Sequence, residues 1–128
     1  MKDHWGAFYS AYGKAPFFEY FSEDFRDIWF KKQNYLVDVN HEFLQLCLKL
    51  LQVNVNLTDT VILKKEIEFD FTNQIIPKES YQERKIYRPH PYTQLFGDTF
   101  VPNLSIMDLI MCAGPQSKEI LTASFLQP

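Results

Sequence analysis

The sequence predicts an α+β fold that is predominantly helical, with a small sheet or hairpin near residues 53–71. Apolar residues recur at helical spacing before residue 52 and again after residue 104. Residues 53–57 and 66–71 instead alternate apolar and polar side chains with a period of two, the pattern of a half-buried strand. With 128 residues and 46% hydrophobic content, the chain can build one core and is too short for two ordinary domains. Residues 1–128 are therefore expected to form a single domain.

The N-terminal segment predicts consecutive helices with a strongly aromatic side. Aromatic residues recur at helical spacing from Trp5 to Tyr12, and Gly13 followed by Pro16 ends that helix. Proline suits the first turn of a helix, so residues 16–32 are expected to form two short helices or one kinked helix.

The next helix is expected to be the central element of the core. Asn40 is a favourable N-cap residue, and the residues after it are apolar except for a narrow polar stripe that includes His41 and Gln45. Cys47 lies among the leucines of this helix. Neither it nor Cys112 has the spacing of metal ligands, so we expect two buried free thiols, a reducing compartment and no metal site.

Residues 72–92 are expected to form a long surface loop. Pro77, Pro89 and Pro91 interrupt any regular pattern in a segment that is otherwise largely polar. His90 lies between two of these prolines, which would hold it in a stiff part of the loop. We therefore regard His90 as a candidate catalytic residue.

The same loop contains the one concentrated group of basic and aromatic side chains in the chain. Guanidinium groups bind phosphate through paired hydrogen bonds, and tyrosine rings stack on bases or sugar rings. Arg84, Lys85, Arg88 and Tyr92 are therefore candidate ligands for a nucleotide-activated sugar. A solvated loop whose tyrosines pack on the domain is the alternative.

A well-specified helix is predicted to follow Ser105. Ser105 and Asp108 have the spacing of a capping box, in which side chains satisfy the first free amides of a helix. Gly114 can adopt the left-handed conformation that ends a helix, and Pro115 can open the next one. Capping accounts for Asp108, and a role as a catalytic acid or base is the alternative.

Composition excludes several classes of partner. A net charge of -3 and a pI of about 5.5 argue against binding to a nucleic-acid backbone, which requires a basic face. No signal peptide opens the chain, and residues 43–53 are too short and too polar to span a bilayer. The sequence thus predicts a cytoplasmic protein that has no membrane or nucleic-acid partner.

Three segments resemble a known family. They are His4-Trp5 with Ser10-Ala11-Tyr12-Gly13-Lys14-Ala15-Pro16-Phe17-Phe18-Glu19-Tyr20, then Tyr92-Thr93-Gln94-Leu95-Phe96, and Phe100-Val101-Pro102-Asn103-Leu104-Ser105-Ile106-Met107-Asp108-Leu109-Ile110-Met111 with Gly114-Pro115. On these residues the chain resembles the WbqC-like family, whose members are linked to bacterial surface-polysaccharide gene clusters. The match is to the C-terminal part of the family pattern, so the chain is expected to be the C-terminal part of a longer protein whose upstream segment is absent. The resemblance adds His4 as a candidate catalytic residue and Gln94 as a candidate ligand-binding residue.

The resemblance implies that the protein acts in O-antigen or capsule synthesis and transfers an acyl or aminoacyl group to a nucleotide-activated amino sugar. The alternative is a non-catalytic interaction module that docks on a partner enzyme or on the missing upstream segment. Enzymatic activity is therefore left open, and no cofactor is expected.

Two structural features would distinguish these readings. Exposed rings of Trp5, Phe8 and Phe18 would favour the interaction module. A cleft that joins Arg88, His90 and Tyr92 to the helix at Ser105 would favour the enzyme.

Overall fold

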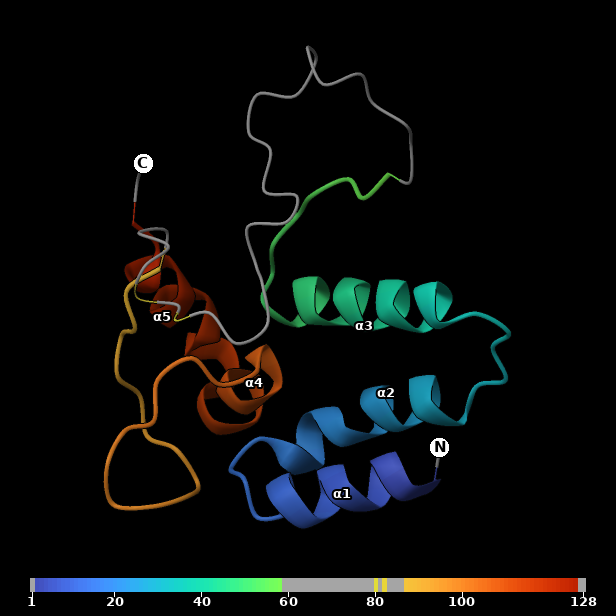
Figure 1. Ribbon diagram of the computed structural model, residues 1–128, viewed down its shortest axis with the longest axis horizontal. Coiled ribbons are helices and arrows are strands. Elements are labelled where there is room, and N and C mark those ends of the chain that lie inside the picture. Colours follow the sequence, from blue (N-terminus) through green and yellow to red (C-terminus); the bar gives the residue numbers. More distant parts are fainter. Residues whose placement is uncertain (1, 59–79, 81, 83–86, 127–128) are drawn as a thin grey trace.

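Helices dominate the computed structural model, which describes residues 2–58, 80, 82 and 87–126. Three of them, α1 to α3, lie side by side in one layer, and the shorter α4 and α5 lie at one end of it (Figure 1). The predominantly helical character predicted from the sequence is thereby confirmed. The elements are α1 Lys2–Tyr12, α2 Phe18–Phe30, α3 Leu36–Leu50, α4 Ile106–Ala113, the 3-10 helix η3 Gly114–Gln116 and α5 Ser117–Ser124.

The layer is an antiparallel meander in which α2 lies between α1 and α3 (Figure 1). The turn after α1 is tight, because the Ala15 amide donates to the Tyr12 carbonyl oxygen at 2.8 Å, three residues back; just before it, the Gly13 amide donates to the Tyr9 carbonyl oxygen at 2.8 Å. A Cβ atom at Gly13 would lie 2.6 Å from that oxygen, so a side chain there would collide with the backbone. The first helix ends at Tyr12 as predicted, and residues 18–30 form one continuous helix.

Aromatic rings from all three helices form the centre of the core. The ring centroid of Phe8 in α1 lies 5.8 Å from that of Phe18 and 4.8 Å from that of Trp29, both in α2. Trp29 in turn lies 5.1 Å from Phe43 of α3, edge to face. Such tilted and edge-on pairs add about 0.5–1.5 kcal/mol each to the burial of the rings. Aromatic packing therefore joins the three helices of the layer.

The start of α3 differs from the prediction. The helix begins at Leu36, so Asn40 lies inside it and is not the N-cap. Tyr35 precedes the first turn and makes no side-chain capping hydrogen bond, while Asp38 places a negative charge near the positive end of the helix. An ion pair between Lys31 and Glu42 connects the end of α2 to α3. Tertiary contacts and the helix dipole therefore stabilise the start of α3, where no side chain forms a capping hydrogen bond.

The small sheet predicted near residues 53–71 is wrong for residues 53–58, the part of it that the structure describes. The end of α3 gives the reason. The Val53 amide donates to the Leu48 carbonyl at 2.9 Å and the Gln52 amide to the Lys49 carbonyl at 3.0 Å, the two bonds of a Schellman cap. Val53 thus belongs to a helix terminus, and its side chain packs on the core. Residues 53–58 form no strand, and residues 66–71 lie outside the described residues.

The C-terminal helices are fixed by the turn at Gly114. Its φ of +52° is costly for any residue with a Cβ atom, and a Cβ atom there would lie 2.4 Å from the ring of Phe17. The Phe17 amide also donates to the Met111 carbonyl at 3.1 Å. The predicted end of this helix at Gly114 is therefore confirmed, and the turn brings α4 against the beginning of α2.

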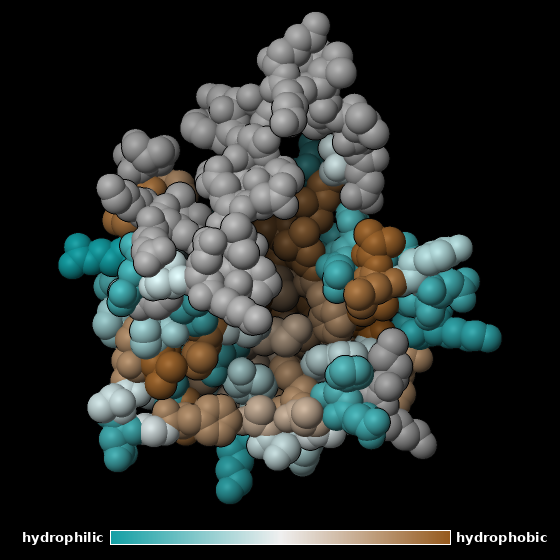
Figure 2. Space-filling view, viewed as in Figure 1, coloured by the Kyte–Doolittle hydropathy of each residue, from teal (hydrophilic) through white to brown (hydrophobic). Residues whose placement is uncertain are grey.

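Both cysteines are free and buried, as the sequence predicts. Burial raises the pKa of the Cys47 thiol, and burial followed by the nearby Asp108 raises that of Cys112. No helix in the described part of the chain is long and apolar enough to cross a membrane. On the face seen in Figure 2, apolar side chains line the central hollow and hydrophilic side chains project around the edge.

Candidate functional site

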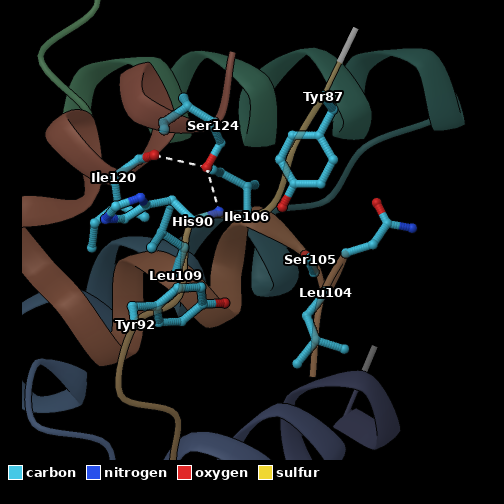
Figure 3. A pocket seen from close by; sticks show the side chains of 11 residues that line it. Tyr87, His90, Tyr92, Leu104, Ser105, Ile106, Leu109, Ile120 and Ser124 are labelled. Carbon is cyan, nitrogen blue, oxygen red and sulfur yellow. Dashed lines mark hydrogen bonds between the residues drawn. The ribbon is translucent and has the colours of Figure 1, made fainter. Parts of the chain in front are cut away.

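A cavity of about 180 Å³ lies where residues 87–92 cross the start of α4 and the end of α5 (Figure 3). Tyr87 and Tyr92 enter it from opposite sides in this view, with Ile106 and Leu109 between them. The described residues that line it are Tyr87, His90, Tyr92, Asn103, Leu104, Ser105, Ile106, Leu109, Ile120, Leu121 and Ser124.

The end of α5 holds the segment that carries His90. Tyr87 forms an isolated antiparallel bridge with Phe125, and the Arg88 amide donates to the Ser124 carbonyl at 2.8 Å. The buried Ser124 hydroxyl donates to the Ile120 carbonyl at 2.8 Å and accepts from the His90 amide at 3.1 Å (Figure 3). Residues 87–90 are therefore fixed through their backbone, which leaves their side chains to shape the cavity.

Asp108 lies behind the cavity wall. It is 0% exposed, and its Oδ2 atom accepts a hydrogen bond of 2.6 Å from the Tyr92 hydroxyl. Burial, and then this hydrogen bond, raise the pKa of Tyr92. Burial and the charge of Asp108 also raise the pKa of Tyr12 in α1. Asp108 thus sets the orientation of Tyr92, whose ring forms one wall of the cavity.

The capping-box prediction is therefore correct for one residue and wrong for the other. Ser105 is the N-cap of α4, and its Oγ atom accepts from the Met107 amide at 3.3 Å. The Asp108 carboxylate contributes nothing to the cap, since it points inward to Tyr92. Asp108 is also cut off from solvent and does not line the cavity, so it is not placed to exchange protons with a ligand there.

Gln94 has a structural part in the neighbouring loop. Its Nε2 atom donates to the Val101 carbonyl at 2.8 Å, and its Oε1 atom accepts from the Val101 amide at 2.8 Å. This pair of bonds closes the loop between residues 94 and 101 as a strand partner would. A longer contact of 3.5 Å joins Gln94 to Asp108. Both the nitrogen and the oxygen of the Gln94 side-chain amide therefore form hydrogen bonds within the protein.

The structure brings together some of the predicted site residues and not others. His90 and Tyr92 reach the cavity, as expected for a cleft next to the Ser105 helix. Arg88 is exposed next to them and is not among the described lining residues, while His4 is exposed on α1. Arg84 and Lys85 lie outside the described residues. Within the described residues, no group of three or more His, Cys, Asp and Glu side chains could hold a metal ion.

Sequence reasoning missed the contribution of α5. Ile120 and Ser124 are one helical turn apart, and both line the cavity. The available signal was a helix-compatible run after Pro115 with a small polar residue near its end. It did not indicate that Ser124 accepts a hydrogen bond from a backbone amide 34 positions away.

Comparison with known proteins gives a family. A model of the WbqC-like protein family matches residues 1–79 and 70–120. No curated protein and no solved structure matches. The two matched segments overlap, cover most of the chain and include the residues on which the sequence resembles this family. The chain belongs to the WbqC-like protein family.

Proposed function

We propose that this protein acts in the synthesis of bacterial surface polysaccharide, O-antigen or capsule, and that its cavity binds the sugar ring of a nucleotide-activated amino sugar. The observation that carries the proposal is the cavity, which joins His90 and Tyr92 to the helix at Ser105. Family membership supplies the context. Free, buried cysteines are consistent with the cytoplasm, where we place the protein in this proposal.

The size of the cavity limits which part of the ligand enters it. A cavity of roughly 150 Å³ holds one benzene molecule. The volume of about 180 Å³ therefore suits one six-membered ring and is too small for a whole nucleotide sugar. In this proposal the sugar ring lies between Tyr87 and Tyr92, and the nucleotide remains outside.

Arg88 is suited to the diphosphate that would project from the cavity. Tyr87 directly precedes it and His90 follows two positions later, and both line the cavity, while the side chain of Arg88 itself is exposed. Because a guanidinium group binds phosphate through paired hydrogen bonds, Arg88 is the proposed phosphate contact.

His90 is the proposed base for acyl or aminoacyl transfer. In such a step the sugar amine attacks the carbonyl carbon of an activated acyl donor such as a thioester. The C–N bond forms, the C–S bond breaks with departure of the thiolate, and His90 accepts the proton that the amine loses. Histidine is the side chain most often used to transfer protons in such steps.

Calorimetric titration with several nucleotide sugars tests the binding proposal. We expect binding by the wild type, at least tenfold weaker binding by Arg88→Ala, and unchanged binding by Arg26→Ala, which removes an exposed arginine on α2. Failure of every nucleotide sugar to bind would contradict the proposed function. Equal affinity of the wild type and Arg88→Ala would exclude Arg88 as the phosphate contact.

Transfer is tested separately by mass spectrometry of the sugar product after incubation with an acyl thioester. His90→Ala should lose transfer even at sugar concentrations that saturate it, whereas the control His41→Ala on α3 should retain both binding and transfer. Undiminished transfer by His90→Ala would show that another group accepts the proton.

The interaction module receives less support from the residues named for it. Phe8 and Phe18 are buried in the core, and Trp5 packs against the same cluster. These rings therefore do not form the exposed aromatic surface that docking would require. The expectation that residues 1–128 are the C-terminal part of a longer protein stays a prediction.

A further inference from the structure

Three of the polar side chains that line the cavity form hydrogen bonds within the protein. The Ser124 hydroxyl both donates and accepts, as described above. The hydroxyl proton of Tyr92 goes to Asp108, and the Ser105 oxygen accepts from the amide that it caps. Ser124 therefore has both its proton and an acceptor site engaged and Tyr92 has its proton engaged, whereas the Ser105 hydroxyl keeps its proton for a ligand.

An aliphatic wall is contributed by residues around the start of α4 and by residues of α5. They are Leu104, Ile106, Leu109, Ile120 and Leu121. In Figure 3, Ile106 and Leu109 lie near Ile120, and Leu104 lies apart from them. A hydroxyl group pressed against such a wall loses its water partners and gains none, whereas a methyl group gains by leaving water.

The polar lining groups not accounted for by these bonds belong to other residues. His90 contributes an imidazole ring, Asn103 a side-chain amide and Tyr87 a phenolic hydroxyl group. A ligand that matches the whole surface is therefore polar on one edge and carries an apolar substituent on another. Among hexoses, replacement of the C6 hydroxymethyl group by a methyl group gives this combination.

We infer that the cavity selects a 6-deoxy amino sugar, with the C6 methyl group against the aliphatic wall formed by Leu104, Ile106, Leu109, Ile120 and Leu121. This inference rests on the proposed function, because it assumes that the cavity holds the sugar ring. Beyond the proposed function, it names the class of sugar that binds. A C6 hydroxyl group would bind less well because the aliphatic wall offers it no hydrogen-bond partner.

The test compares two nucleotide sugars that differ by one oxygen atom. The wild-type protein is titrated with UDP-glucosamine and with its 6-deoxy counterpart, UDP-quinovosamine, both of which carry the free amine that the proposed transfer requires. The 6-deoxy sugar should bind about tenfold more tightly, since an unpaired buried hydroxyl group lowers affinity by that order. Equal affinity, or tighter binding of the hydroxylated sugar, overturns the inference and leaves the proposed function standing. Failure of both to bind overturns the two together.

A polar substitution in the wall locates the source of the discrimination. Leu121→Ser changes a partly exposed residue, so the fold should tolerate it, and the new hydroxyl group should reduce the preference for the 6-deoxy sugar at least threefold. The matched control Leu44→Ser changes an exposed leucine of α3 outside the cavity and should keep the full preference. An equal preference in Leu121→Ser and the wild type would contradict selection by this wall.

Discussion

Replacing Tyr92 by phenylalanine is expected to destabilise the protein by about 2 kcal/mol, because the change removes one strong hydrogen bond and leaves the ring in place. The lost bond of 2.6 Å ends on a carboxylate that is 0% exposed, so no water replaces the missing donor. The Gln94 contact of 3.5 Å is too long to compensate, and Gln94 is already held by Val101. Hydrogen bonds to charged groups contribute about 1.5–3 kcal/mol each, from which the expected loss follows.

Urea unfolding followed by far-ultraviolet circular dichroism measures this loss. The matched control is Tyr35→Phe, which removes the hydroxyl group of a tyrosine that is 70% exposed and should change stability by less than about 0.5 kcal/mol. A change of the same small size in Tyr92→Phe, with the same denaturant dependence as the wild type, would refute the argument that Asp108 depends on Tyr92.

The same pair predicts a loss of stability at alkaline pH. The pKa of Tyr92 is raised above its ordinary value of 10.0, chiefly by burial. The unfolded side chain releases its proton near pH 10 while the folded one retains it, so the stabilisation is complete below about pH 10 and is lost as the pH rises toward the folded-state pKa. Tyr92→Phe should therefore lose less stability than the wild type between about pH 9 and about pH 11. Parallel pH profiles would contradict this.

Three further predictions concern the fold. Gln52→Gly should stabilise the protein by about 0.5 kcal/mol in urea unfolding, because Gln52 has a φ of 54° that glycine adopts without strain; a destabilised variant would contradict the capping geometry. Gly114→Ala should cost more than about 2 kcal/mol, since it combines a positive φ with a collision against Phe17, and a thermal midpoint equal to that of the wild type would exclude this strain. Cys47 should react with a thiol reagent only after unfolding, so rapid labelling of the native protein at Cys47 would show that its burial is wrong.

Local signals predicted the parts of the fold that local physics decides. The Ser105 cap joins residues two positions apart, and the positive φ of Gly114 follows from a conformation that glycine favours. Helical periodicity located α1 and most of α3, because each buries one side against its neighbours, whereas residues 16–32, expected as two short helices or one kinked helix, form the single helix α2. The prediction that Asn40 caps α3 was wrong, since the helix begins at Leu36. Capping propensity is weak compared with tertiary contacts.

Long-range contacts decided the parts that the sequence could not predict. Asp108 has the spacing of a capping residue, yet it turns inward because Tyr92, 16 positions away, donates to it. Val53 begins an alternating stretch, yet its amide completes the cap of α3. His90 and Tyr92 were recognised as candidates from composition, but their position next to the Ser105 helix depends on the contact with Ser124.

The central claim, that the cavity holds the sugar ring of a nucleotide sugar, is tested most directly by methyl-resolved NMR. The protein, labelled with carbon-13 at isoleucine and leucine methyl groups, is titrated with UDP-quinovosamine. The methyl signals of Ile106, Leu109 and Ile120 should shift with one common binding curve, while those of Leu46, buried in the core of the layer, should stay in place. Binding that leaves the cavity methyl signals unchanged, or no binding at all, would contradict the claim.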